Sequence, residues 1–409
     1  MECVRIDRYE RPLMHILYIT NGFPYPLTSG YLRHYFLIKE LSARHAITLL
    51  SIVRNGFTAE HVAAMAPMTR RVMTFRAADK SAGRMRDALQ AIRNLAGGDP
   101  AVRQMCFAIG ELTQRETFDA VLLSGKQTIP AMRVLGKLPV VVDVCDAASV
   151  RMLGTARHAP VAQRPVLLLK YLHLRQLERR LVRRAAHALF ASCRDREALV
   201  DGPGGRATVI PNGVDLGFWR RSSSRRGRDT IVFTGRMDFP ANADAAVHLI
   251  DEIFPLVRRS VGDAKLLIVG GNPTPALIYA GRRAGVSVTG FVADVRPYLE
   301  RATVFAFPLR FGAGIQNKLL EAMAMEVPVV ASPLAADGLR TAEGRRPPLQ
   351  VGYDRIHFAE LLTQALVEGA DDPAPDTEAR RFVEQHFVWK HSGEKLEQII
   401  RSVADSTKG

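Results

Sequence analysis

One loop of the sequence gathers residue types suited to binding an anion. In the segment PLRFGAGIQNKLLEAMAMEVPVVAS (308–332), Gly312 and Gly314 follow a short apolar run, and a helical pattern begins near Ile315. Glycines let the backbone approach a ligand closely, and N–H groups at the start of a helix favour negative charge. The N–H groups of Gly314, Ile315 and Gln316 are therefore candidates for binding a pyrophosphate.

Two charged side chains follow this loop at helical spacing. Lys318 would add a positive charge to the phosphate site, and Glu321, about one turn further on, would accept hydrogen bonds from ribose hydroxyls. A glycine turn followed by a solvated lysine and glutamate is the simpler alternative. Because the glycines, the cation and the carboxylate coincide at one strand end, we favour a nucleotide-binding loop.

Both halves of the chain alternate short apolar strands with helical patterns. We expect strands in the first half at 15–20, 46–53, 120–124, 139–146, 188–192 and 207–213. We expect strands in the second half at 230–237, 264–271, 286–291, 303–309 and 327–332. Continuous apolar strands alternating with helices are typical of parallel sheets covered on both faces. The sequence therefore predicts an α/β fold with two Rossmann-like doubly wound domains and a ligand cleft between them.

The length also indicates two domains, because 409 residues exceed the size at which one hydrophobic core keeps growing. We predict an N-terminal domain at 13–217 and a basic, serine-rich linker at 218–229. A C-terminal nucleotide-binding domain follows at 230–380, and a helical segment at 381–405 is expected to pack back across the linker.

Composition and charge limit the partners and the compartment. The formal net charge of +15 favours anionic partners, namely phosphorylated substrates, anionic lipid headgroups or nucleic acid. The four cysteines form no disulfide or zinc pattern, which fits a reducing compartment. Neither a signal peptide nor a stretch of ~20 apolar residues is evident, so we expect a cytoplasmic protein.

Several longer segments resemble a known enzyme family. GIQNKLLEAMAMEVPVVAS (314–332), IPNGVD (210–215) and VTGFVADVRPYL (288–299) resemble the donor-site signature of retaining GT-B glycosyltransferases of family 4. GRMDFPANADAAVHLIDEIFP (235–255) and VGGNPTPAL (269–277) resemble the branch of sugar transferases associated with exopolysaccharide and PEP-CTERM export loci. The resemblance implies transfer of a sugar, with retention, from a nucleotide-sugar to a glycan or lipid-linked acceptor in exopolysaccharide or cell-surface polysaccharide biosynthesis.

The resemblance also implies roles for residues on the donor side. Glu321 would bind the donor ribose, and the backbone around Phe291 and Val292 would line the nucleobase. Arg236 and Lys318 would face the diphosphate and stabilise the leaving nucleotide, which makes them the predicted catalytic residues. No DxD triplet is present to hold a metal, so we expect no cofactor besides the substrate, a UDP-, GDP- or ADP-sugar.

Two positions depart from the family pattern. Ala313 stands eight residues before Glu321, where the family has a glutamate that contacts the donor sugar; this leaves Arg310 as a candidate replacement. The lysine usually found shortly after the GR of the first C-terminal strand is missing, and Lys318 is expected to take its place. Because of Ala313, a degenerate and inactive relative is an alternative.

Four residues of the N-terminal half are candidates for the acceptor side. Gly30 stands where relatives carry a glycine pair, and Arg33, one turn into the next helix, would face the cleft. Asp143 and Asp146 end a strand, where a carboxylate suits an acceptor hydroxyl contact or a general base. An ordinary turn and capping carboxylates are the open alternatives.

The remaining alternatives concern surface charge and reaction type. The basic, leucine-striped helix around 170–184 would hold the protein at anionic headgroups of the cytoplasmic membrane, or it is a solvated face. A nucleotide-sugar epimerase or hydrolase of GT-B fold is a rival enzyme. A nucleic-acid-binding protein is a rival from another class, although the basic residues are dispersed and show no aromatic-basic pattern.

Overall fold

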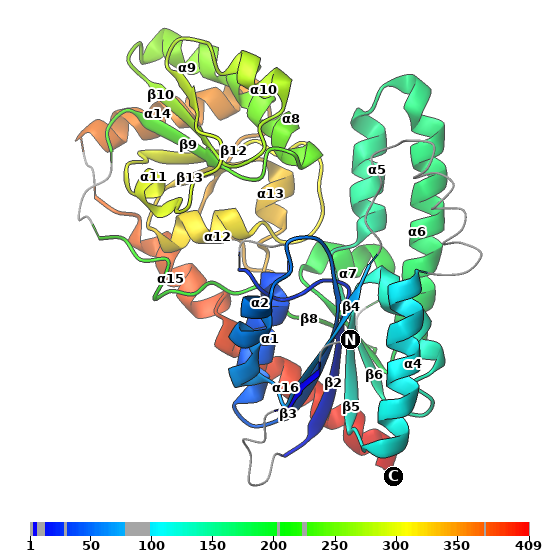
Figure 1. Ribbon diagram of the computed structural model, residues 1–409. Coiled ribbons are helices and arrows are strands. Elements are labelled where there is room, and N and C mark those ends of the chain that lie inside the picture. Colours follow the sequence, from blue (N-terminus) through cyan, green and yellow to red (C-terminus); the bar gives the residue numbers. More distant parts are fainter. Residues whose placement is uncertain are drawn as a thin grey trace.

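The chain forms two α/β domains, one above the other in Figure 1. The computed structural model describes residues 3–5, 13–27, 31–77, 99–202, 205–222, 227–371 and 374–408. Each domain is built on one mostly parallel sheet with helices packed on its faces. This is the predicted pair of Rossmann-like units.

The N-terminal sheet has eight strands in the order β1-β4-β3-β2-β5-β6-β7-β8, and only β1 runs antiparallel, against β4. Its strands are β1 (Cys3–Arg5), β2 (His15–Thr20), β3 (Ala46–Val53), β4 (Arg71–Arg76), β5 (Ala120–Ser124), β6 (Val140–Cys145), β7 (His187–Phe190) and β8 (Ala207–Val209). Every residue of β3 and β5 is buried, as expected of parallel strands covered on both faces.

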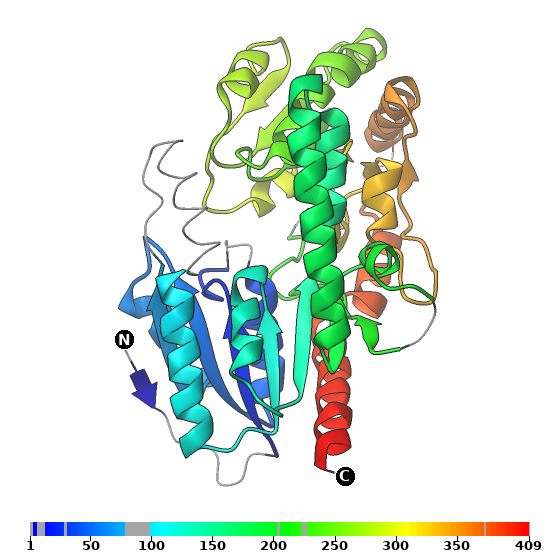
Figure 2. The same cartoon turned by 90° about the vertical axis from the view of Figure 1, so that its right-hand side faces the viewer.

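The N-terminal helices cover both faces of this sheet. They are α1 (Leu32–Ser42), α2 (Ala59–Met65), α4 (Pro100–Arg115), α5 (Ala148–His158), α6 (Arg164–Arg184) and α7 (Cys193–Leu199). Apolar side chains of α1 and α2 share one core with the sheet, and those of α4 share the core on the opposite face. Figure 2 shows α5 and α6 as an antiparallel hairpin that extends past the sheet, beside the C-terminal domain.

The C-terminal sheet has six parallel strands in the order β11-β10-β9-β12-β13-β14. Its strands are β9 (Thr230–Thr234), β10 (Lys265–Val269), β11 (Val286–Val288), β12 (Val304–Phe307), β13 (Val329–Ala331) and β14 (Gln350–Val351). Its helices are α8 (Pro240–His248), α9 (Phe254–Ser260), α10 (Pro275–Ala280), α11 (Arg296–Glu300), α12 (Asn317–Ala324), α13 (Pro333–Asp337) and α14 (Arg355–Asp371). A π-helical turn, Leu249–Ile253, joins α8 to α9.

The last two helices lead the chain from one domain back to the other. Helix α15 (Thr377–His386) packs on α12 of the C-terminal domain, and α16 (Trp389–Lys408) lies along α1 of the N-terminal domain. Between them, Val388 forms a parallel bridge with Val214. The ring of Trp389 then stacks on Phe36, with centroids 4.8 Å apart. The C-terminal segment therefore contributes to the core of the N-terminal domain.

Most predicted strands agree with the structure, and the bounds of β2, β3 and β5 are those predicted. Three strands were not predicted, namely β1, β4 and β14. β1 lies in a charged start, β4 has an arginine at each end, and β14 is two residues long, so none gives a strong apolar run. Along the chain, residues 218–222 and 227–229 of the predicted linker lie between β8, the last strand of the N-terminal sheet, and β9, the first strand of the C-terminal sheet.

Candidate functional site

The glycine loop lies where β12 ends and α12 begins, at the carboxyl edge of the C-terminal sheet. Gly314 has a φ of 72°, a conformation that L side chains rarely adopt. Helix α12 begins at Asn317, with Gln316 as its N-cap residue, slightly later than the start predicted near Ile315. The Gln316 Nε2 group donates a hydrogen bond to the Ala313 carbonyl, 3.2 Å away, which holds the loop turned before the helix.

Lys318 and Glu321 form a partly buried polar cluster with Asn242 of α8. The Lys318 Nζ atom donates to Asn242 Oδ1 at 3.2 Å and lies 5.1 Å from the Phe307 ring centroid. Burial lowers the pKa of Lys318 to about 8 and raises the pKa of Glu321 to about 7, and the attraction between the two charges partly opposes both shifts. Such shifts are common where a site is arranged to meet a charged ligand.

Asn242 was not singled out from the sequence, although it joins two predicted residues. Its side chain is 4% exposed and its Nδ2 atom donates to the Arg236 carbonyl at 2.9 Å. Asn242 therefore links the loop after β9 to Lys318. The only sequence signal was its place in the first turn of a helix that begins with Pro240, which alone indicates a helix start.

The predicted cation Arg236 lies on that loop with an exposed side chain. Its Nε and Nη2 atoms pair with Asp238 at 3.1 and 2.6 Å, and this carboxylate raises the pKa of the guanidinium. The structure thus brings the backbone of Arg236 to the Lys318 cluster, while the guanidinium is paired two residues along the chain.

Three further donor-side candidates belong to this domain. Arg310 makes a bidentate ion pair with Asp244 of α8, at 2.8 and 2.5 Å. The guanidinium predicted to contact the donor sugar is therefore already paired in this structure. Phe291 is 78% exposed and lies beside Gly271, just after β10, whereas Val292 packs against the domain core. Phe291 and Val292 follow β11, at the carboxyl edge of the sheet, where the nucleobase was expected.

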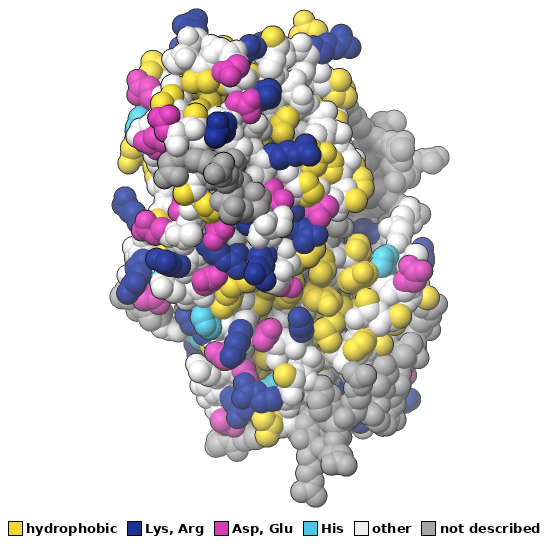
Figure 3. Space-filling model, turned by 90° about the vertical axis from the view of Figure 1, so that its left-hand side faces the viewer, with side chains coloured by type: hydrophobic (Ala, Val, Ile, Leu, Met, Phe, Trp, Pro, Cys, Tyr) yellow, Lys and Arg dark blue, Asp and Glu magenta, His cyan; other side chains and the backbone are white. Residues whose placement is uncertain are grey.

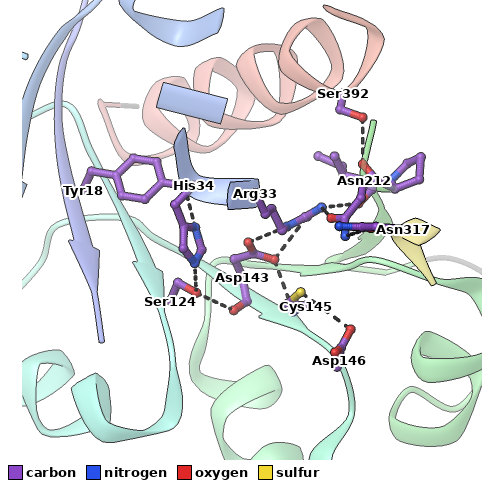
Figure 4. Close-up of polar contacts among 12 residues, drawn as sticks. Tyr18, Arg33, His34, Ser124, Asp143, Cys145, Asp146, Asn212, Asn317 and Ser392 are labelled. Carbon is purple, nitrogen blue, oxygen red and sulfur yellow. Dashed lines mark hydrogen bonds and ion pairs between the residues drawn. The ribbon is translucent and has the colours of Figure 1, made fainter. Parts of the chain in front are cut away.

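Two acceptor-side candidates, Arg33 and Asp143, form an ion pair inside the N-terminal domain (Figure 4). Arg33 is 3% exposed, and its Nε and Nη2 atoms donate to Asp143 at 2.8 and 3.2 Å. Its Nη1 atom donates to the Ile210 carbonyl and to Asn212 Oδ1, each at 2.9 Å. The expectation that Arg33 faces the cleft is wrong for this structure, because its guanidinium is buried and fully engaged.

The same network includes a buried histidine. His34 Nδ1 lies 3.0 Å from the Tyr18 hydroxyl, and His34 Nε2 lies 3.1 Å from Ser124 Oγ. Burial lowers the pKa of His34 to about 4, so the ring is neutral near pH 7. Both ring nitrogens have partners, which makes His34 a structural residue.

This network reaches the other domain at the first residue of α12. The Asn212 Nδ2 group donates to Asn317 Oδ1 at 2.8 Å (Figure 4). At the near end of the glycine loop, the His158 ring of α5 stacks on Phe311, with centroids 5.2 Å apart. Residues on both sides of Gly314 therefore contact the N-terminal domain.

Gly314 itself meets two carboxylates of the N-terminal domain. Its N–H donates to Asp195 Oδ2 at 2.7 Å, and a Cβ atom on residue 314 would lie 1.8 Å from Asp146 Oδ1. Burial, together with the neighbouring Asp146 carboxylate, raises the pKa of Asp195 to about 6. Asp146, predicted for the acceptor side, thus lies against the donor loop. Gly30 lies outside the described residues.

Asp195 is the main site residue that sequence reasoning missed. It follows Ser192 in the pattern Ser-x-x-Asp, and Ser192 caps α7 by accepting a hydrogen bond from the Asp195 N–H. That pattern indicates a helix start, which hides any other role of the carboxylate. Its contact partner stands 119 residues further along the chain.

Comparisons with known proteins agree with this architecture. Residues 228–366 match the family model described as glycosyl transferases group 1. The chain is similar to the GDP-mannose-dependent alpha-(1-6)-phosphatidylinositol monomannoside mannosyltransferase of Mycobacterium tuberculosis, with 28% identity over 234 residues. That match covers 51% of this chain and 59% of the mycobacterial protein, so it spans little more than half of the relative's length.

Two solved structures resemble the whole chain. HepE of Anabaena in complex with UDP and glucose superposes with a TM-score of 0.61 at 14% identity, covering 95% of this chain and all of HepE. Sucrose-phosphate synthase from Thermosynechococcus elongatus superposes with a TM-score of 0.65 at 14% identity, covering 96% of this chain and 100% of that structure. At such identities the likeness concerns the fold.

The protein therefore has the GT-B fold, two Rossmann-like domains that face each other, as the sequence predicted. Residues 228–366 match the family model of the glycosyl transferases group 1, which agrees with the predicted resemblance at that level. The narrower exopolysaccharide and PEP-CTERM branch stays a prediction.

Proposed function

We propose that the protein is a glycosyltransferase that transfers a sugar from a nucleotide-sugar to a glycan or lipid-linked acceptor. The observation that carries this proposal is the cluster of Lys318, Glu321 and Asn242 beside the glycine loop, at the carboxyl edge of the sheet in the group 1 domain. Ligands of open α/β sheets bind at this edge.

The side chains of the cluster would bind different parts of a nucleoside diphosphate. The Glu321 carboxylate makes no hydrogen bond or ion pair within the described part of the chain, so it is available to ribose hydroxyls. Lys318 and the N–H groups at the start of α12 would stabilise charge on the leaving diphosphate. A phosphate beside Lys318 would also favour its charged form. We propose a metal-independent, retaining reaction, with Arg236 turning from Asp238 toward the diphosphate.

For the acceptor, the proposal is a lipid-linked molecule at a membrane surface. The M. tuberculosis relative is named for a phosphatidylinositol-linked substrate, and a lipid-linked acceptor would be met at the inner face of the cytoplasmic membrane. Within the described residues, no helix has the length and apolar character needed to span a membrane. We therefore propose peripheral contact with anionic lipid.

The tip of the α5–α6 hairpin is the surface we propose for this contact. Its exposed apolar side chains are Val161, Val166, Leu168, Leu169 and Leu172. Residues 147–177 contain five Lys and Arg residues and neither Asp nor Glu. An exposed apolar patch in a segment whose charged residues are all Lys or Arg suits binding to an anionic membrane. The predicted site at 170–184 thus moves toward the start of the helix, because Glu178 and Leu181 are buried.

A matched pair of variants tests this surface. Leu169→Glu should reduce binding to vesicles that contain anionic lipid several-fold, measured by sedimentation. Phe107→Glu replaces an equally exposed apolar residue on α4 and should leave binding unchanged, since Leu169 is 68% and Phe107 70% exposed. Equal loss in both variants, or loss in neither, would rule out the hairpin tip as the contact.

The rival functions make different predictions. On the face shown in Figure 3, basic side chains lie interspersed with acidic ones, which does not favour a nucleic-acid surface there. The Asp146 and Asp195 carboxylates beside Gly314 do favour one rival, a nucleotide-sugar hydrolase or epimerase, because they could act as acid and base.

The experiment that separates these functions follows the sugar. The protein is incubated with UDP-, GDP- and ADP-sugars, with and without a lipid extract, and products are identified by mass spectrometry. A transferase yields a glycosylated acceptor and a nucleoside diphosphate only when the extract is present. Free sugar or an epimerised donor without the extract would favour the rival enzyme, and no reaction with any donor would contradict the proposal.

A further inference from the structure

The hydrogen bond between Asp195 and Gly314 joins an anion of one domain to the predicted anion-binding loop of the other. We propose that the Asp195 carboxylate is an internal competitor of the donor diphosphate, which must displace it from Gly314. The inference rests on the proposed function, because it assumes that the glycine loop binds a diphosphate. It makes Asp195 a positioning residue that acts through the loop and sets donor affinity.

The contact has the geometry of a bound anion. The Gly314 N–H to Asp195 Oδ2 distance is 2.7 Å, within the range of charge-assisted hydrogen bonds to a carboxylate. The Ser192 hydroxyl donates to the same oxygen at 2.8 Å and holds the carboxylate in place. A phosphate oxygen directed at this N–H would occupy the position of Asp195 Oδ2.

The second oxygen of the Asp195 carboxylate distinguishes this contact from a fully paired structural hydrogen bond. Asp195 is fully buried, and its Oδ1 atom has no hydrogen-bond partner within the described part of the chain. A buried, half-satisfied carboxylate costs free energy, which displacement toward solvent would return. The arrangement is therefore suited to being exchanged for a ligand.

The charges around Gly314 point the same way. Asp146 lies against the Cα of Gly314, Arg194 precedes Asp195 in α7, and the Cys145 thiol is next to Asp146. Arg194 Nη1 is engaged by the Leu334 carbonyl at 3.0 Å. A diphosphate bound at Gly314 would therefore lie beside two carboxylates, and repulsion between like charges would weaken its binding while they stay.

Calorimetric titration of the whole protein with UDP, GDP and ADP tests the competition. Asp195→Asn keeps an oxygen that can accept the Gly314 bond but removes the negative charge, so the preferred nucleotide should bind about threefold to tenfold tighter. The matched control is Glu197→Gln. Glu197 lies on the same helix, and its ion pair with Arg340, at 2.8 Å, also crosses between domains. This control should change affinity less than twofold.

Hydrogen exchange of the wild-type protein gives a second readout that needs no variant. If the nucleotide displaces Asp195, exchange should decrease around residues 314–321 and increase in α7. Protection of both segments would overturn the competition, as would unchanged or weaker binding by Asp195→Asn when the wild type binds. If neither the wild type nor Asp195→Asn binds any nucleotide, the proposed function fails as well, and the two failures are thereby distinguished.

Discussion

Two polar clusters, one in each domain, differ in how completely their side chains are paired. In the N-terminal cluster, every nitrogen of the Arg33 guanidinium donates a hydrogen bond, and Asp143 is 1% exposed. In the C-terminal cluster, the Lys318 ammonium group has one hydrogen-bond partner and the Glu321 carboxylate has none within the described residues. Because native proteins pair most buried polar groups, we expect the ligand at the less completely paired C-terminal cluster.

The largest expected effect comes from the paired cluster. Arg33→Met leaves Asp143 buried without its cation and should cost about 3–5 kcal/mol of unfolding free energy. Urea denaturation of the variant measures this loss. The double variant Arg33→Met/Asp143→Leu should recover much of it, because the uncompensated charge is then gone. A single variant as stable as the wild type would contradict a structural role.

The next effect concerns the contact between Gly314 of the glycine loop and Asp146 of the N-terminal domain. Gly314→Ala places a methyl group at a φ of 72° and against Asp146, whereas Gly344→Ala, at a φ of 83°, meets nothing within 4 Å. Both variants carry backbone strain of about 1–2 kcal/mol. Gly314→Ala should cost at least about 1 kcal/mol more, from overpacking. Equal melting temperatures would mean that the loop has room to move away from Asp146.

A smaller effect should appear in the pH dependence of stability. Burial raises the pKa of Glu321 from 4.5 to about 7, so the folded protein binds this proton more tightly than the unfolded chain. This group therefore contributes stability below pH 4.5, and the contribution is lost as the pH rises through 7. Relative to Glu321→Gln, the wild type should become less stable across this window, as measured by urea denaturation. Parallel curves would contradict the shift.

The smallest effect is an expected absence of destabilisation. Lys318→Met and Glu321→Leu remove partly buried charged groups with few partners, so unfolding free energies should change by less than about 0.5 kcal/mol or increase. Thermal denaturation measures this change. A loss of several kcal/mol in either variant would place the C-terminal cluster with the structural one and remove the contrast.

The sequence was informative where function and local pattern coincide. The glycines, Lys318 and Glu321 lie within a few residues of one another, so helical spacing alone placed them on one loop and helix. The strands of both sheets were predicted because buried parallel strands are continuous apolar runs. The fold class followed from their alternation with helices.

Contacts between distant segments could not be predicted in this way. Arg33 meets Asp143 across 110 residues, and Gly314 meets Asp195 across 119. Nothing local distinguishes a cleft-facing arginine from a buried one, or a capping aspartate from one that crosses a domain interface.

The most direct test of the account is calorimetric titration of UDP, GDP and ADP into the wild type, Lys318→Ala and Glu321→Ala. Glu360→Ala, which removes an exposed carboxylate of α14, is the control. The account predicts that one nucleotide binds the wild type and Glu360→Ala equally. It also predicts that this nucleotide binds each cluster variant at least about tenfold more weakly, a loss of about 1.4 kcal/mol. Equal binding by all four proteins would contradict the claim that the cluster of Lys318 and Glu321 is the donor site.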